Sequence, residues 1–498
     1  MLDETLSTYF PSWLVRLDTA PSSRDPLGLQ AHAMGHADKL LPGLNVFTSR
    51  ARYYTFLCWA IARAQADAPE RTHLDRVHRL ERLLVLCEAL RHEDAPDACS
   101  YVGRRRGRRF VTERQGAGLW ELPTRILKNQ SSNGALRLYR TSLADLELIE
   151  EDDLEGGLGL RLTSRGQQLA SQLDKVVDER IVAWALEPEP DRKKQRESLC
   201  NLAKGMCLSG RVGAYERRHL LTSLFGAEGH GIDRRETVQI LFEHDLLAAA
   251  PVGADIASAD ADLVSEEGGK PAEVAADNET RGNWAVLRRA LELPPSNRLH
   301  PVQVAGAYQL MALSLNALLA SALVPVQQHG RLSILAWHAK VAERAGSHFE
   351  ASAAQVWAGH RRPVEVADDL LNSDSPSWPE VAMLALELLL RLVLDERYLR
   401  WLADGPTPLV ERVIIWSRNA GTANARAMAA QLLPDLVEHH AEVSARKGKG
   451  EWLVLDGPEL VKNDPRLMRP MLHSLRFAQL QQLAADLSLR PEDVTDET

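Results

Sequence analysis

Apolar residues recur at three- and four-residue spacing along most of this chain, and that period limits its fold more than any other feature. Between residues 54 and 91 the repeat is formed by Leu74, Val77, Leu80, Leu83, Leu84, Leu86 and Leu90. This spacing predicts two antiparallel helices joined by the polar residues 67–72. Leucine and alanine are abundant, whereas only eight phenylalanines and eight tyrosines occur in 498 residues, which favours helices over sheets. We expect a mainly α-helical, multidomain protein.

Changes in composition divide the chain into six segments. We expect a helical domain (1–100), a module that mixes helices and strands (101–180), a helical domain (181–250), an acidic flexible linker or loop (251–282), a helical domain (283–440) and a strand-helix region (441–498). Residues 252–281 contain no aromatic side chain, so they bury too little surface to become ordered. Pro434 is expected to end a helix over residues 422–433. Residues 451–457 predict a strand that enters an Asp-Gly turn.

The order of elements after residue 135 is the most specific local pattern. A helix is predicted over residues 136–146, then an acidic turn with two glycines, a strand at 158–162 and a second helix capped by Thr163. Gly166 would let that second helix pack closely. This order resembles the second half of a winged-helix domain, in which the hairpin is the wing. The expected fold class is therefore mainly α, with an embedded winged-helix-like α+β module.

Basic side chains near this module are candidates for contact with DNA phosphates. They are the run Arg104, Arg105, Arg106, Arg108 and Arg109, together with Arg137, Arg140, Lys128, Asn129 and Gln130. Lys447 and Lys449 form a second local positive patch. The wing carries acidic residues that would repel a duplex, namely Glu150, Glu151, Asp152, Asp153 and Glu155. DNA binding and a purely structural or protein-binding role are both consistent with these charges.

Residues 25–59 contain a Pro42-Gly43 turn and then an aromatic helix that Thr48 is expected to cap. Arg50 and Arg52 lie at the start of this helix, where amides and guanidinium groups together would bind an anion. In the alternative interpretation the two arginines pair with internal acids such as Asp25 or Asp38 and lock the turn onto the helix.

The same stretch resembles the start of a family of uncharacterised bacterial proteins that carry a domain of unknown function. The matching residues are Asp25, Leu27, Gly28, Leu29, Leu40, Pro42, Gly43, Thr48, Arg50, Ala51, Arg52, Tyr53, Tyr54, Phe56 and Trp59. Members of that family tend to lie in mobile or phage-defence neighbourhoods. The resemblance implies that biological setting and no particular activity.

The charge and cysteine content indicate a cytoplasmic protein. A net charge of −9 means that any surface for nucleic acid is a local patch. Five cysteines without a CxxC pair argue against a disulfide scaffold and against a thiolate zinc site. The acidic N-terminus does not suit a signal peptide. Charged residues interrupt the longest apolar runs, so we expect no membrane partner.

Sequence motifs for catalysis are weak or missing. The chain has no GxxxxGK[ST] phosphate loop, no convincing GxGxxG and no GxSxG. His32 and His36 have the spacing of two zinc ligands, but the glutamate of an HExxH motif is missing. We therefore predict no catalytic residue, no metal and no cofactor.

The sequence favours a non-enzymatic DNA-binding or assembly subunit of a bacterial, antiphage-type multiprotein system. Its expected partners are DNA and other proteins of that system. One alternative is a protein-only scaffold or adaptor whose winged helix does not touch DNA. Another is a nuclease-type hydrolase, whose site would be assembled from scattered acids and histidines without a local motif.

Overall fold

The computed structural model describes residues 25–495, and its gaps are short apart from one of 34 residues. The gaps are 46, 49, 67–68, 95–98, 100, 128, 152–157, 187–192, 248–281, 347–360, 373–376, 405–406, 420–424, 449–450, 463–471 and 473–474. The chain is mainly α-helical with small antiparallel sheets, as the apolar period predicted. The predicted acidic linker (251–282) lies outside the described residues except for Gly282, which is helical.

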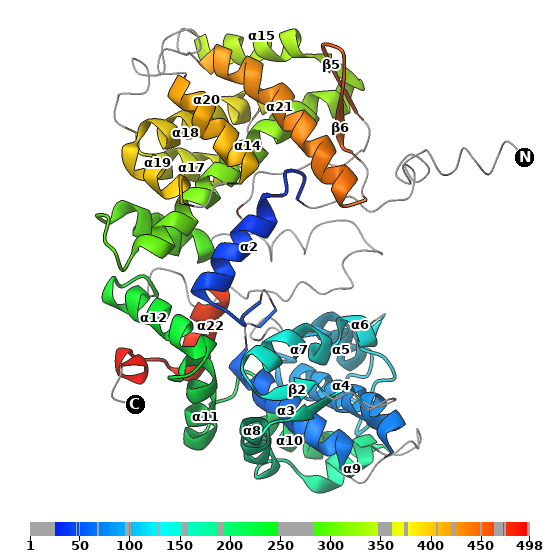
Figure 1. Cartoon of the computed structure of the whole chain (residues 1–498). Coiled ribbons are helices and arrows are strands. Elements are labelled where there is room, and N and C mark those ends of the chain that lie inside the picture. The colour runs from blue at the N-terminus through cyan, green and yellow to red at the C-terminus, as the bar shows by residue number, and fades with distance from the viewer. Residues whose placement is uncertain are drawn as a thin grey trace, which may run out of the picture. The chain divides into compact units, whose positions relative to one another are not determined.

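The chain forms two compact units, and each unit is built from two separate stretches of sequence. The first unit consists of residues up to 36 and residues 287–473, and the second of residues 37–286 and 474–498. Helix α2 (Leu29–Leu40) contains the point at which the chain passes from the first unit into the second. Figure 1 shows the helices and strands of both units.

A long helix forms the core of the first unit. Helix α14 (His300–His329) packs along α18 (Trp378–Leu394), and the Ser314 hydroxyl donates to the carbonyl of Ala385 at 2.7 Å. Within the described part of the chain, α14 is the one helix long and apolar enough to cross a membrane, and 94% of its apolar window is buried inside the protein. That burial accounts for its apolar sequence, because a core helix needs no polar face.

Shorter helices surround this core. They are α15 (Ile334–Ala345), α17 (Pro363–Asn372), α19 (Glu396–Leu402), α20 (Pro408–Asn419) and α21 (Ala425–Arg446). Helix α21 continues through Pro434, so the predicted end of the helix is wrong. Leu433, Leu436 and Val437 are buried on both sides of the proline, and their packing outweighs the one backbone hydrogen bond that proline cannot make.

The predicted strand and turn near the C-terminus are confirmed. Strands β6 (Leu453–Asp456) and β7 (Glu459–Lys462) form a hairpin around Gly457, which has a φ of 60°. Strand β5 (Arg331–Ser333), which was not predicted, pairs with β7 and completes a three-stranded sheet.

The second unit is a helical bundle around α3 (Ala51–Gln65), whose side chains are almost all buried. Helices α4 (His73–Arg91) and α8 (Ser164–Asp174) pack against α3, and α10 (Arg196–Met206) packs against α4. The predicted helix pair over residues 54–91 is therefore confirmed. Helices α9 (Glu179–Leu186), α11 (Ala214–Phe225), α12 (His230–Glu243) and α22 (Phe477–Leu487) also belong to this unit.

A helix, a hairpin and a second helix follow one another where the sequence predicted them. Helix α7 (Ala135–Asp145) leads into β2 (Ile149–Glu151), which pairs antiparallel with β3 (Leu160–Leu162) before α8 begins. Thr163 caps α8 as expected, because its hydroxyl accepts from the Gly166 amide at 3.1 Å. Strand β1 (Leu119–Trp120) does not extend this hairpin and pairs instead with β4 (Lys194–Gln195).

Helix α3 is capped by a distant residue. The Thr48 hydroxyl bonds to the backbone of Asn45, so the predicted cap is wrong. The carboxylate of Asp486 on α22 accepts from the Ala51 amide at 3.0 Å instead. An acid at this end of a helix also interacts favourably with the helix dipole.

Candidate functional site

The predicted arginine run forms a helix, α5 (Arg104–Thr112). Gly107 faces α4, where an added Cβ would lie 2.6 Å from a methyl group of Val85. Arg105 and Arg109 are exposed and the other arginines of the run are half-buried. Each of the five interacts with other groups of the protein, and Arg109 forms a 2.8 Å ion pair with Glu113. The run thus forms a basic helix that packs on α4.

Helix α7 presents a second polar surface. Leu136, Tyr139 and Leu143 face the core, whereas Arg137 and Thr141 are exposed. Arg140 is half-buried, and its guanidinium donates to the carbonyl of Gly159 in the hairpin at 3.1 Å. Of the predicted DNA-binding residues, Arg137 therefore points to solvent and Arg140 connects the helix to the hairpin.

The acids of the predicted wing are partly matched by arginines. Glu150 pairs with Arg161 at 2.9 Å, and Glu151 lies 3.8 Å from Arg140. Glu147, at the start of the hairpin, pairs with Arg165 at 2.7 Å. Asp152, Asp153 and Glu155 lie outside the described residues.

A buried carboxylate holds the start of α7. Glu81 of α4 accepts from the Leu136 amide at 2.8 Å and from the side-chain amide of Gln130 at 2.7 Å. Gln130 belongs to the short helix α6 (Gln130–Asn133) and also donates to the carbonyl of His78 on α4. Helices α5, α6 and α7 are therefore all fixed to α4.

Burial of Glu81 predicts a pH-dependent stability. Burial raises the pKa of this carboxyl from 4.5 to about 7, against the opposing effect of the hydrogen bonds from Gln130 and Leu136. Between these pH values the folded protein keeps a proton that the unfolded chain has lost. We therefore expect the free energy of unfolding to fall, on the order of 3 kcal/mol for this group, as pH rises from about 4.5 to 7. Denaturant unfolding at several pH values measures this loss.

The variant Glu81→Gln isolates the effect, because an amide does not titrate in this range. Its free energy of unfolding should depend on pH less steeply than that of the unchanged protein between pH 4.5 and 7. Parallel curves for the two proteins would contradict a buried, protonated Glu81.

Arg50 and Arg52 are buried, with exposed fractions of 7% and 6%. Arg52 pairs with Glu216 at 3.1 Å and donates to the carbonyls of Cys207 and Gly205 at 2.6 and 2.9 Å. Arg50 pairs with Asp486 at 3.3 Å. These contacts favour the alternative interpretation, in which both arginines pair with acids inside the protein instead of binding an anion.

The acids that we named as partners are engaged elsewhere. Asp25 pairs with Lys447 at 3.1 Å inside the first unit, and Asp38 pairs with Arg476 at 2.5 Å inside the second. Lys449 lies outside the described residues. Lys447 is thus the one described lysine of the second positive patch, and its ammonium group pairs with the carboxylate of Asp25.

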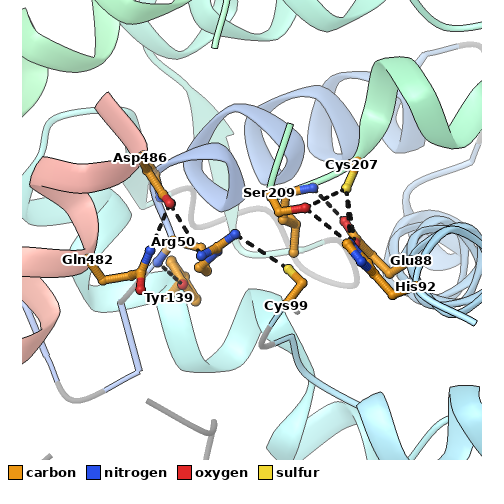
Figure 2. A network of polar contacts seen from close by, with 11 residues as sticks. Arg50, Glu88, His92, Cys99, Tyr139, Cys207, Ser209, Gln482 and Asp486 are labelled. Atoms are coloured by element: carbon orange, nitrogen blue, oxygen red, sulfur yellow. Dashed lines mark hydrogen bonds and ion pairs between the residues drawn. The ribbon is translucent and has the colours of Figure 1, made fainter. Parts of the chain in front are cut away.

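The polar contacts of Arg50 lead to four side chains that lie close together and that no sequence motif indicated (Figure 2). The Arg50 guanidinium donates to the Cys99 thiol at 3.4 Å. Beyond it, Cys207 Sγ lies 3.3 Å from Glu88 Oε2 and 3.7 Å from His92 Nε2, and these last two atoms are 3.4 Å apart. Glu88, His92 and Cys99 place one ligand atom each within 4.8 Å of one another. We call Glu88, His92, Cys99 and Cys207 the thiol cluster.

Three different elements supply the thiol cluster. Glu88 and His92 are one turn apart at the end of α4, Cys99 lies between α4 and α5, and Cys207 ends α10. The Glu88 side chain is fully buried. Hydrogen bonds with Cys207, Cys99 and Glu88 raise the pKa of His92 to about 11. No CxxC pair marks the thiol cluster in the sequence; its one local signal is Glu-x-x-x-His with a cysteine seven residues later.

The predicted histidine pair lies in the first unit. Nε2 of His32 and Nε2 of His36 are 3.2 Å apart, which is a hydrogen-bonding distance. Both imidazoles pack on the ring of Tyr308, with centroids 4.5 and 4.8 Å away. A hydrogen bond and an aromatic contact account for this arrangement.

Comparison with models of known protein families, with curated proteins and with solved structures gives no match. The resemblance of residues 25–59 to an uncharacterised bacterial family therefore stays a prediction.

Proposed function

We propose that the protein is a non-enzymatic DNA-binding or assembly subunit of a bacterial, antiphage-type multiprotein system, and that α7 and α5 contact duplex DNA. The observation that carries this proposal is the exposed Arg137 and Thr141 on α7, directly before a hairpin. A helix in this position of a winged helix enters the major groove, and nearby basic side chains bind phosphates.

The support from α4 strengthens the proposal. Gly107 packs α5 closely on α4, and Glu81 ties the start of α7 to the same helix. The arginine run of α5 and the exposed face of α7 are therefore both supported by α4. Because both helices are supported in this way, their side chains can contact DNA base edges and the DNA backbone at the same time without a large loss of conformational entropy.

A protein-only scaffold is the second candidate, and the charges of the hairpin favour it. Glu150 and Glu151 extend from β2 beside Arg161 and Arg140. Their carboxylates would lie close to DNA phosphates if the hairpin followed a groove. A basic surface on another protein would instead complement them. The bacterial defence setting rests on the resemblance of residues 25–59 alone.

Salt dependence of binding to a labelled DNA duplex tests the proposal. We expect the logarithm of the affinity to fall steeply with the logarithm of salt concentration, because bound arginines release counterions from DNA. In the triple variant Arg105→Gln, Arg109→Gln and Arg137→Gln, each lost phosphate contact should reduce the slope by about one. Fluorescence anisotropy at five salt concentrations measures both slopes.

The control variant removes three exposed arginines from the first unit, Arg331→Gln, Arg344→Gln and Arg400→Gln, with the same change in net charge. It should keep the slope of the unchanged protein. Equal loss in both variants, or no binding at low salt, would overturn DNA contact through α5 and α7. Stable association with a partner protein without DNA affinity would support the scaffold. Degradation of the DNA in the presence of magnesium would support the nuclease alternative instead.

A further inference from the structure

We propose that Glu88, His92, Cys99 and Cys207 bind one zinc ion in a closed tetrahedral site. Two thiolates, one imidazole and one carboxylate are all ligand types that zinc accepts, and four protein ligands are typical of structural zinc. This inference is independent of DNA binding and departs from the expectation, based on the missing CxxC pair, that the protein has no metal.

The distances within the thiol cluster suit a tetrahedral ion. Zinc bonds of about 2.3 Å to sulfur and about 2.0 Å to nitrogen or oxygen place ligand atoms roughly 3.3 to 3.8 Å apart. The separations of Cys207 Sγ from Glu88 Oε2 and from His92 Nε2 are 3.3 and 3.7 Å. The separation between the His92 and Glu88 atoms is 3.4 Å. Three of the four ligands therefore already form one face of a tetrahedron.

Cys99 supplies the fourth corner. Its sulfur lies within 4.8 Å of the ligand atoms of both Glu88 and His92, although it comes from the chain between α4 and α5. The ligand atoms that all lie within 4.8 Å of one another do not include Cys207 Sγ, so Cys99 would move toward the other three ligand atoms when zinc binds.

The groups around the thiol cluster can balance the net negative charge that remains when zinc is bound. Two thiolates and a carboxylate carry three negative charges, and zinc cancels two of them. The buried Arg50 guanidinium, 3.4 Å from Cys99 Sγ, lies beside the remaining negative charge. The Ser209 hydroxyl, 3.1 Å from Cys207 Sγ, can donate to that sulfur, as groups around structural zinc thiolates do.

His92 and Glu88 form an ion pair in the thiol cluster, and zinc would take the place of the His92 proton, because an imidazole binds a metal in its neutral form. Thiols are weak hydrogen-bond donors, yet Cys207 is the neighbour of a fully buried Glu88 carboxylate. Glu88 Oε1 already accepts from the backbone amide of Leu208. Soft sulfur with imidazole selects zinc over magnesium or calcium, which prefer oxygen ligands.

A bound ion would connect three segments of the second unit. It would join the end of α4, the end of α10 and the chain that leads into the arginine helix α5. The amide of Val102, three residues after Cys99, already donates to the Tyr53 hydroxyl on α3 at 2.8 Å. Zinc would thus hold the Cys99 end of this short connection, and the Tyr53 hydroxyl holds its Val102 end.

Metal analysis of the full-length protein, produced with zinc in the medium and without a histidine tag, tests the site. We expect about one zinc per chain, and at least about a tenfold lower content in Cys99→Ala and Cys207→Ala. The matched control is Cys87→Ser, a buried cysteine of α4 whose sulfur faces the carbonyl of Leu199 on α10. This control should keep its zinc.

A second measurement uses the unchanged protein, so it does not depend on how the variants fold. After removal of zinc with a chelator, added cobalt should give the absorption bands of a tetrahedral, thiolate-bound ion, and added zinc should abolish them. Removal should also lower the melting temperature of the second unit, and zinc should restore it. Absence of zinc and of cobalt bands would overturn the proposal, as would a Cys99–Cys207 disulfide found by mass spectrometry in the freshly purified protein.

Discussion

Replacement of Arg234 by alanine should lower the free energy of unfolding of the second unit by roughly 4 kcal/mol, a large effect for one side chain. Arg234 is 1% exposed. Its guanidinium donates to the carbonyls of Leu224 and Pro42 at 2.6 Å each and to that of Ser223 at 3.1 Å. Alanine would leave three buried carbonyls without their donor and would open a cavity.

The hydrogen bond from Arg234 to the Pro42 carbonyl extends the stabilising effect of Arg234 beyond α12. It fixes the Pro42-Gly43 turn, in which Gly43 has a φ of 73° and an added Cβ would lie 2.7 Å from Asp145. Arg234→Lys should recover less than half of the loss, because one ammonium group cannot reach three carbonyls in the geometry of the planar guanidinium.

Calorimetry should show the transition of the second unit at a temperature lower by roughly 10 °C in Arg234→Ala. The neighbouring residue provides the control. Arg235 is half-buried, and we expect Arg235→Ala to change stability by less than about 1 kcal/mol. Similar melting temperatures for Arg234→Ala and the unchanged protein would show that the three carbonyl contacts do not stabilise the fold.

Gly166→Ala should destabilise the same unit by about 3 kcal/mol, because the close contact is with backbone and not with a movable side chain. An added Cβ would lie 2.1 Å from the carbonyl oxygen of Leu148. That oxygen accepts from the Thr163 amide at 3.1 Å, so relief of the clash would separate the hairpin from the start of α8.

The control for this glycine is Gly118→Ala, because an added Cβ there has no heavy atom within 4 Å. We expect its melting temperature to change by less than about 2 °C. Calorimetry of both variants gives the comparison. A Gly166→Ala protein as stable as Gly118→Ala would mean that the hairpin and α8 separate at little cost, and that the glycine is not needed for their packing.

The features that the sequence predicted depend on neighbours in the chain. The helix pair over residues 54–91 follows from apolar spacing, and the Thr163 cap reaches only as far as Gly166. The turn at Gly457 follows from Asp-Gly chemistry. Each of these features is determined by residues that are close together in the sequence, through their local conformational preferences.

The features that failed depend on residues far away in the sequence. Asp486 replaces Thr48 as the cap of α3 from 435 positions along the chain. Tertiary packing carries α21 through Pro434. The thiol cluster joins Cys207 to Glu88, which is 119 positions earlier. No spacing rule detects such pairs, because the fold that brings them together must be known first.

Each unit is built from two separate stretches of sequence, and this affects how the protein folds while it is being synthesised. Helix α22 lies in the last 25 residues of the chain, yet its Asp486 carboxylate caps α3 and pairs with Arg50 near the beginning. When the ribosome has produced residues 37–286, this helix has not been made, so α3 emerges without its cap. The second unit can reach its final form only after residues 474–498 have been made, and a premature stop before residue 474 would remove the cap of α3 from the part that was made earlier.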